Sequence, residues 1–211
     1  MNAAEACAVA VGHGGCGTGR PVAPRYRAVP EDQADVRGPV ARYRIVPERS
    51  RVRIDARSSL HPIHSESTGL TGFFEAEVLG GGRVNLQVAP AATLELPVEL
   101  LSSGNAMYDR EMRRRVDARR FPTIRGQLTE MKETGRAGRY LVRGDITFMG
   151  VTRPYEDEVT LEVLDGGRLL IEGAHEFDIR DFGMQPPRIL MLKVHPEVSV
   201  RVSIVAEKEG G

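Results

Sequence analysis

Two neighbouring histidines are the first residues of this sequence that could do chemistry. His61 and His64 stand three positions apart in "LHPIH". A zinc-binding helix instead places its two histidines four residues apart on one face, and Pro62 between this pair indicates a strand-to-loop segment. His175 and His195 could complete a metal site in space, but we favour histidines in loops or at strand ends. We therefore expect no metal site.

Serines and paired carboxylates offer the other routes to catalysis. Three serines lie near these histidines: Ser58, Ser59 and Ser65. The sequence holds no G-x-S-x-G segment, which would present a serine nucleophile on a sharp strand-to-helix turn. Asp178 and Asp181 flank Arg180, a pattern that favours a salt-bridged turn over a carboxylate pair for acid–base catalysis. We expect no catalytic residues, with a hydrolase or isomerase as the alternative.

Residues 1–40 differ in composition from the rest of the chain. They are rich in Gly, Ala, Pro and Arg and show no sustained hydrophobic period, so they cannot bury enough apolar surface to offset their ordering entropy. Cys7, His13 and Cys16 supply only three candidate zinc ligands, without zinc-knuckle spacing. We predict a flexible N-terminal tail over residues 1–40 and one folded domain over residues 41–211.

The overall composition limits the partners of the protein. The formal net charge is zero and the pI is about 7, whereas a non-specific nucleic-acid binder normally carries a basic excess. No apolar run approaches the roughly 18 residues of a transmembrane helix, and the apolar patch Ala6–Val11 lacks the basic flank of a signal peptide. We expect a cytoplasmic protein with no nucleic-acid partner and no transmembrane segment, and export is the alternative.

A basic helix is predicted near residues 105–119, where six arginines lie between positions 110 and 120. Asn105 is the expected N-cap, and Pro122 should end the helix because the residue before a proline is pushed out of helical geometry. Residues four apart lie on the same face of a helix. An apolar stripe on this helix, which we expect to pack against the rest of the protein, therefore consists of Tyr108, Met112 and Val116.

The arginines of this helix divide into paired and unpaired ones. Asp109 precedes Arg113 by four residues and Glu111 precedes Arg115 by four, which is the favourable order for helical ion pairs. Two arginines, Arg110 and Arg114, have no such partner and repel each other mildly. We expect a solvated helix at one end of the fold, and as a second hypothesis Arg110 or Arg114 contacts an anionic head group at a mouth.

Most of the remaining chain alternates between apolar and polar residues, the period of β-strands. In "EVSVRVSI" the residues Val198, Val200, Val202 and Ile204 share one face. Glycine-rich turns join such segments and no helix separates most of them, which indicates antiparallel pairing. The expected strands are 42–46, 51–56, 72–79, 84–88, 93–100, 123–130, 139–150, 158–163, 168–178 and 197–204. This many half-buried strands predict an all-β fold, either a barrel or a sandwich.

Five segments, in order, resemble one known family. "YRIVPERSRVRIDARSS" and "GLTGFFEAEV" resemble the opening strands of the YceI-like, polyisoprenoid-binding family. "YDREMRRRVDARRFPTIRGQL" is similar to its helix-then-strand segment, and "YLVRGDITFMGVTRPYEDEV" to its central hairpin. "FDIRDFGM" followed by "VSVRVSIVAEK" is similar to its closing segment. The resemblance covers about residues 42–207.

The resemblance implies an extended, lipocalin-like antiparallel barrel of about eight strands that holds a long isoprenoid or similar lipid. The residues agree, since a chain with no tryptophan and 5% aromatic residues must line its barrel with aliphatic side chains, which suit a flexible hydrocarbon. The candidate lining residues are Ile54, Phe73, Leu94, Leu96, Val142, Ile146, Phe148, Leu161 and Phe177. We expect an open apolar tunnel, no cofactor besides a bound lipid, and a protein that carries or stores this lipid, and we leave a homodimer open.

Overall fold

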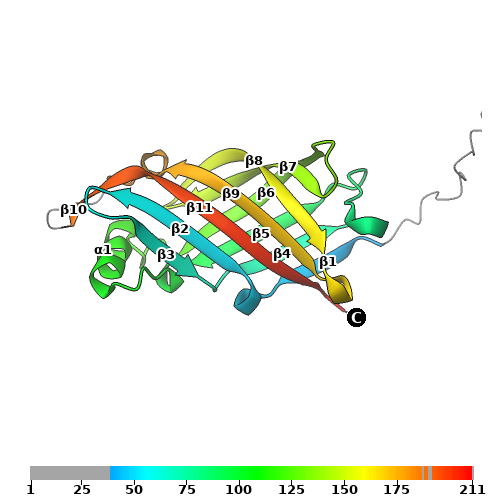
Figure 1. Ribbon diagram of the computed structural model, residues 1–211, viewed down its shortest axis with the longest axis horizontal. Coiled ribbons are helices and arrows are strands. Elements are labelled where there is room, and N and C mark those ends of the chain that lie inside the picture. The colour runs from blue at the N-terminus through cyan, green and yellow to red at the C-terminus, as the bar shows by residue number, and fades with distance from the viewer. Residues whose placement is uncertain (1–38, 187, 190–191, 211) are drawn as a thin grey trace, which may run out of the picture. The chain divides into compact units, whose positions relative to one another are not determined.

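The computed structural model describes residues 39–186, 188–189 and 192–210. All of the predicted tail except Pro39 and Val40 lies outside these residues, as do Cys7, His13 and Cys16. Within the described part of the chain, the structure consists of antiparallel strands and one α-helix (Figure 1). The elements are β1 (Ala41–Ile45), β2 (Arg51–Ser58), β3 (Ile63–Ser67), β4 (Thr71–Ala76), β5 (Ala91–Pro97), α1 (Ala106–Val116), β6 (Thr123–Glu133), β7 (Arg139–Phe148), β8 (Val151–Val163), β9 (Leu169–Asp178), β10 (Arg188–Ile189) and β11 (Leu192–Lys208).

The predicted barrel is confirmed. Eight strands close it in the order β1, β4, β5, β6, β7, β8, β9 and β11, and β11 pairs back onto β1. Strand β11 is long enough to serve two partners on one edge, because its first part pairs with β2 and its end pairs with β1. The hairpin of β2 and β3 thereby extends the barrel wall at the end where α1 lies (Figure 1). Closure leaves these strands without the exposed edges of an open sheet.

Alternation along the strands decides which side chains fill the barrel. On β1 the residues Ala41, Tyr43 and Ile45 are buried, whereas Arg42 and Arg44 between them are exposed. The register of neighbouring strands extends this inward–outward alternation around the wall, because directly paired residues point to the same side of a sheet. Tyr43 pairs with Phe74, for example, so both rings point inward. The interior is therefore apolar and the outer face carries arginines and glutamates.

One glycine allows two strands of the wall to approach closely. Gly72 on β4 has a φ of +134°, and a Cβ added there would lie 2.0 Å from the carbonyl oxygen of Thr93 on β5. Only glycine adopts this backbone region without severe strain. Gly72 is thus required by the β4–β5 pairing.

Several predicted strand boundaries are wrong, and each error has a local cause. Residues 84–88 form no strand beyond a single bridge between Val78 and Val84. Residues 98–100 form a 3₁₀ turn, which buries Val98 completely but leaves Leu100 exposed. The strand predicted over 139–150 ends at Phe148, because Met149 and Gly150 both have positive φ and form a tight hairpin turn. Strand β3 was missing from the predicted set, since its residues lack clean alternation.

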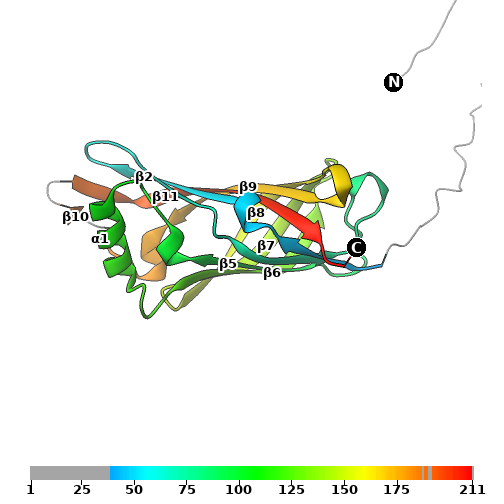
Figure 2. The ribbon, with the colours of Figure 1, turned by 90° about the horizontal axis from the view of Figure 1, so that it is seen from below.

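Helix α1 begins as predicted and ends earlier. The side chain of Asn105 accepts hydrogen bonds from the backbone N–H groups of Met107 and Tyr108 at 3.0 and 3.3 Å. The helix stops at Val116 because Asp117 takes a left-handed conformation with a φ of 51°, so Pro122 is not what ends it. Figure 2 shows α1 standing across one end of the barrel. No helix of the described residues is long and apolar enough to cross a membrane.

Buried side chains occupy much of the barrel interior. At the end away from α1, Tyr140 accepts a hydrogen bond from the backbone of Val84, and this contact helps to hold the 77–90 loop against the core. Val116 of α1 packs with Val98, Ala118 and Met184 at the opposite end. The continuous open tunnel that the sequence suggested is therefore reduced to a cavity between packed ends.

Candidate functional site

The cavity inside the barrel has a volume of about 210 Å³. Strand β1, the consecutive strands from β4 to β9, and β11 contribute to its wall, and most of the side chains that face it are apolar. Gly126 on β6 widens it, because any side chain there would meet Ile146 and Leu94. Hydrogen-bonded strand pairs form most of the wall, although the β8–β9 pairing spans only Val159–Val163 and Leu169–Gly173.

Six of the nine predicted lining residues border this cavity: Phe73, Leu94, Val142, Ile146, Leu161 and Phe177. The other three lie beside it. Ile54 and Leu96 belong to the core cluster around Ile45. Phe148 packs against the cluster beneath α1 and makes an edge-on contact with Phe182, with ring centroids 5.7 Å apart.

Phe73 lies on the wrong side of the wall to be a principal lining residue. Its ring lies 3.7 Å beneath the guanidinium of Arg42, an outward residue of β1. Register confirms this orientation, because Phe73 pairs with Arg44 and Thr93, whereas Phe74 pairs with inward Tyr43. The ring that points into the barrel is therefore that of Phe74, which also borders the cavity.

Two ionisable residues that were not predicted as lining also face the interior. Asp157 on β8 pairs with Val142, and His175 on β9 pairs with Val200, so both point inward. His175 Nδ1 lies 2.5 Å from Asp157 Oδ2. Counting back two residues from inward Val159 and from inward Phe177 would have found them. His175 is thus neither a loop nor a strand-end histidine, because it lies in the middle of β9.

Aromatic rings surround this Asp–His pair. The ring of His175 lies 4.9 Å from that of Tyr155 and 4.5 Å from that of Phe177, both in edge-on geometry. Burial, followed by the negative charge of Asp181, raises the pKa of the Tyr155 hydroxyl above its usual value. That hydroxyl oxygen is buried and has no hydrogen-bond partner among the described residues. The packing of the rings holds the imidazole in one orientation.

The arginines of α1 lie away from the cavity. Arg114, which we predicted to lack an acidic partner, forms an ion pair with Glu111 at 2.7 Å, one helical turn away. Arg115 pairs with the same carboxylate at 2.7 Å, as predicted. Hydrogen bonds from Arg114 and then Arg115 lower the pKa of Glu111 to about 2. Arg110 is exposed on the helix surface, and neither Arg110 nor Arg114 borders the cavity.

Asp109 does not pair with Arg113 as we predicted, because α1 turns its carboxylate toward the preceding loop. The carboxylate accepts hydrogen bonds from the Ser103 backbone at 2.8 Å, from the Ser103 hydroxyl at 2.6 Å and from the Ser102 hydroxyl at 3.1 Å. Burial alone would raise the pKa of Asp109, but these hydrogen bonds outweigh it and lower the pKa. Arg113 instead donates to the backbone oxygens of Glu99 and Leu101.

The remaining histidines have separate structural surroundings. His61 lies in a loop, 3.3 Å from the hydroxyl of Tyr108 on α1. His64 lies on the outer face of β3, with Nδ1 2.5 Å from Asp55 Oδ1. His195 is exposed near the start of β11. The described residues contain no group of three or more His, Cys, Asp or Glu side chains arranged to hold a metal ion.

The turn after β9 forms as predicted from its charges. Arg180 Nη2 lies 2.5 Å from Asp178 Oδ2 within the 3₁₀ turn Ile179–Phe182. Hydrogen bonds from the side chain and backbone of Arg180 lower the pKa of Asp178. This arrangement is a structural turn that carries Phe182 to the aromatic cluster.

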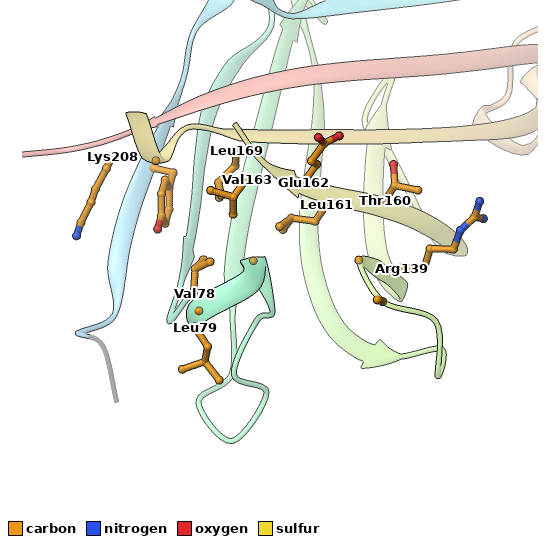
Figure 3. Close-up of a pocket in the computed structure, with 15 residues that line it drawn as sticks. Val78, Leu79, Arg139, Thr160, Leu161, Glu162, Val163, Leu169 and Lys208 are labelled. Atoms are coloured by element: carbon orange, nitrogen blue, oxygen red, sulfur yellow. The ribbon is translucent and has the colours of Figure 1, made fainter. Parts of the chain in front are cut away.

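A second and larger hollow, of about 870 Å³, opens on the surface beside the 77–90 loop (Figure 3). Leu161, Val163 and Leu169 face Val78 across it, as Figure 3 shows. Charged Arg139, Glu162 and Lys208 also line it. We favour the smaller cavity as the site, because strands from all around the barrel line it with mostly apolar side chains. Leu161 borders both hollows.

Comparison with known proteins agrees with this geometry. The YceI-like domain matches residues 43–206. BcnA of Burkholderia cenocepacia has a similar structure, with a TM-score of 0.64 and 15% sequence identity over 76% of this chain and 98% of that protein. A polyisoprenoid-binding domain from Saccharophagus degradans gives a TM-score of 0.62 at 11% identity, over 79% of this chain and 98% of that domain.

A mutant YceI protein of Campylobacter jejuni, crystallised with monobromobimane as guest, gives a TM-score of 0.56 at 9% identity, over 70% of this chain and 85% of that one. At such identities these likenesses show a shared fold. No curated protein matches the sequence. The eight-stranded barrel, the closing helix and the match over most of the chain lead to one conclusion: the protein belongs to the YceI-like family.

Proposed function

We propose that this protein binds a long-chain lipid inside its barrel and carries or stores it. The observation that supports this most directly is the cavity inside the barrel with its aliphatic and aromatic wall. The structural likeness to a polyisoprenoid-binding domain supports the same class of ligand. An isoprenoid or a similar hydrocarbon chain is the ligand that such a wall suits.

We expect apolar burial to drive this binding. Each CH₂ group removed from water contributes about 0.8 kcal/mol, against which the ordering of a flexible chain must be set. The cavity of about 210 Å³ is smaller than the roughly 300–1,000 Å³ of ordinary ligand pockets. We expect a long chain to widen it by moving flexible side chains such as Met131, which is buried against it.

A charge placed in the wall tests the proposal. Ile146→Glu puts a carboxylate into the cavity, and Thr147→Glu puts the same group on the outer face one residue along β7. A lipid cannot cover a buried carboxylate without removing its water, so Ile146→Glu should abolish binding of a fluorescent prenyl probe and Thr147→Glu should leave it unchanged.

Native mass spectrometry and organic extraction of freshly purified protein complete this test. A mass increment of lipid size on the wild-type protein and its loss in folded Ile146→Glu are the expected results. Wild-type protein that carries no lipid and binds no prenyl or fatty probe would contradict the proposal. Circular dichroism establishes that each variant has kept its fold.

The Asp157–His175 pair favours an enzyme on the same scaffold as a second candidate, because a polar cluster inside the barrel is what that alternative requires. A long-chain ester incubated with the protein and then extracted separates the two. We expect the ester to be recovered unchanged. Cleavage that disappears in His175→Gln would favour the enzyme.

A further inference from the structure

The inward Asp157 and His175 interrupt an otherwise apolar wall. Their neighbours on the adjoining strands, Val142 and Val200, are aliphatic. The side chains of His175 and Asp157 keep 26% and 32% of their exposure. Asp157 borders the cavity, and His175 lies beside it on the inward side of β9. A ligand that fills the cavity therefore meets this polar pair.

A purely hydrocarbon ligand would bind poorly at this position. His175 Nδ1 and Asp157 Oδ2 face each other at 2.5 Å, which leaves Nε2 of the imidazole and Oδ1 of the carboxylate directed elsewhere. Neither atom has a hydrogen-bond partner within the described part of the chain. Replacing their water with hydrocarbon would leave buried polar atoms unsatisfied, which costs binding free energy. A ligand with a hydrogen-bonding group here avoids that cost.

The charge of the pair limits what that group can be. The pair is neutral if the imidazole is protonated and carries one negative charge if it is not. Arg143, which follows Val142 on β7, is directed to the outer face, where it pairs with Glu130 and Glu156. An anionic head group would thus meet no net positive charge. An uncharged hydroxyl, which both donates and accepts, fits either charge state of the pair.

We propose that Asp157 and His175 select a lipid with an uncharged, hydroxyl-type polar group and hold that group inside the barrel. Tyr155, whose buried hydroxyl is unpartnered among the described residues, borders the same cavity and fixes the imidazole by ring contact. The inference rests on the proposed lipid-binding function. It assigns the polar group of the ligand to the barrel interior and not to the arginines of α1.

Three ligands with one chain test this selectivity on the unmodified protein. They are geranylgeraniol, the matching hydrocarbon and geranylgeranoic acid, each measured by competition against a fluorescent prenyl probe. We expect the alcohol to bind at least about tenfold more tightly than the hydrocarbon or the anionic acid, which corresponds to about 1.4 kcal/mol. Equal binding of alcohol and hydrocarbon, or tighter binding of the acid, would overturn the inference while leaving lipid binding intact. Failure of all three to bind would overturn both proposals.

A double variant assigns the selectivity to the pair. Asp157→Leu with His175→Leu should remove the preference for the alcohol and keep or improve binding of the hydrocarbon. The outer face supplies a matched control, because Asp55 and His64 form the same kind of pair at 2.5 Å, and Asp55→Leu with His64→Leu should keep the preference. Persistence of the preference in the folded inner double variant would refute the assignment. The single variant His175→Gln, expected to reduce the preference, serves if the inner double variant does not fold.

Discussion

At the scale of single residues, side-chain direction gives the same chemical group different roles. The Asp55–His64 and Asp157–His175 pairs have the same closest distance, 2.5 Å. Asp55 also contacts Arg53 and Arg201 on the outer face, and its hydrogen bonds with His64 and Arg53 outweigh burial and lower its pKa. Asp157 has no arginine beside it among the described residues and faces the cavity. The outer pair is part of a surface ion network, whereas the inner one is available to a ligand.

The Asp109 carboxylate supplies a prediction at this scale. Its pKa is lowered in the folded protein, so its contribution to stability is present above the unfolded pKa of about 3.9 and is lost as the pH falls through the folded value. Asp109→Ala should reduce the free energy of unfolding by about 1–3 kcal/mol at pH 7, because Ser102 and Ser103 lose a shared charged acceptor. Urea denaturation of the wild-type protein and the variant, at pH 7 and at pH 3, measures this loss of stability. A deficit that is as large at pH 3 as at pH 7 would show that the charge is not the cause.

At the scale of the elements, local capping and close strand contacts set the boundaries of the structure. Asn105 and Asp117 limit α1 through their own hydrogen bonds and backbone conformation. Strand β6 contains an irregularity between Leu128 and Glu130, which changes the parity of the inward positions. Leu128 and Met131 both face the cavity although they are three residues apart. Such irregularities decide which side chains an apparently regular strand presents.

A substitution at Gly72 tests the close contact between β4 and β5. Gly72→Ala should destabilise the protein by at least about 3 kcal/mol, because its Cβ would overlap a backbone oxygen of β5 and its φ suits only glycine. Gly135→Ala is the matched control, since Gly135 also has positive φ but has no atom within 4 Å of an added Cβ. That change should cost about 1–2 kcal/mol. Thermal denaturation compares the two, and equal losses would refute the close-contact argument.

At the scale of the whole barrel, the stability of the fold and the room for a ligand oppose each other. The apolar interior stabilises the fold where side chains meet, and empty apolar volume costs stability because the lining lacks contacts. The barrel keeps its cavity between two packed ends, one closed by the 77–90 loop and the other by α1. A ligand would replace those missing contacts and so stabilise the folded state.

Gly126→Ala should raise the stability of the protein and weaken its ligand binding. Its added Cβ would enter the cavity at ordinary contact distances, 3.4 Å from Ile146 Cδ1 and 3.5 Å from Leu94 Cβ. The free energy of unfolding without ligand should rise by about 0.4–1 kcal/mol, because the unfolded chain loses freedom and no backbone clash arises. Binding of the prenyl probe should weaken several-fold. Stronger binding by this variant would show that the cavity beside Gly126 does not receive the ligand.

The periodicity of the chain determined the all-β class, most of the strands and the basic helix with its N-cap, because these depend on residues close together in sequence. The composition of the chain predicted an aliphatic wall, whereas the cavity is lined by aliphatic and aromatic side chains. The alternation of "EVTLEV", extended by two residues toward the N-terminus, and that of the expected strand 168–178 even contained the inward positions of Asp157 and His175.

Only the tertiary structure decided which face each strand turns inward, how much of the interior is filled and which polar residues meet there. Phe73 and Phe74 are adjacent, and only pairing with β1 and β5 separates the outward ring from the inward one. Asp157 and His175 lie on different strands and meet because each lies two residues beyond the last pair of the β8–β9 ladder, Val159 and Gly173. These features depend on contacts between distant segments, and a shift of one residue in register would reverse every side chain of a strand.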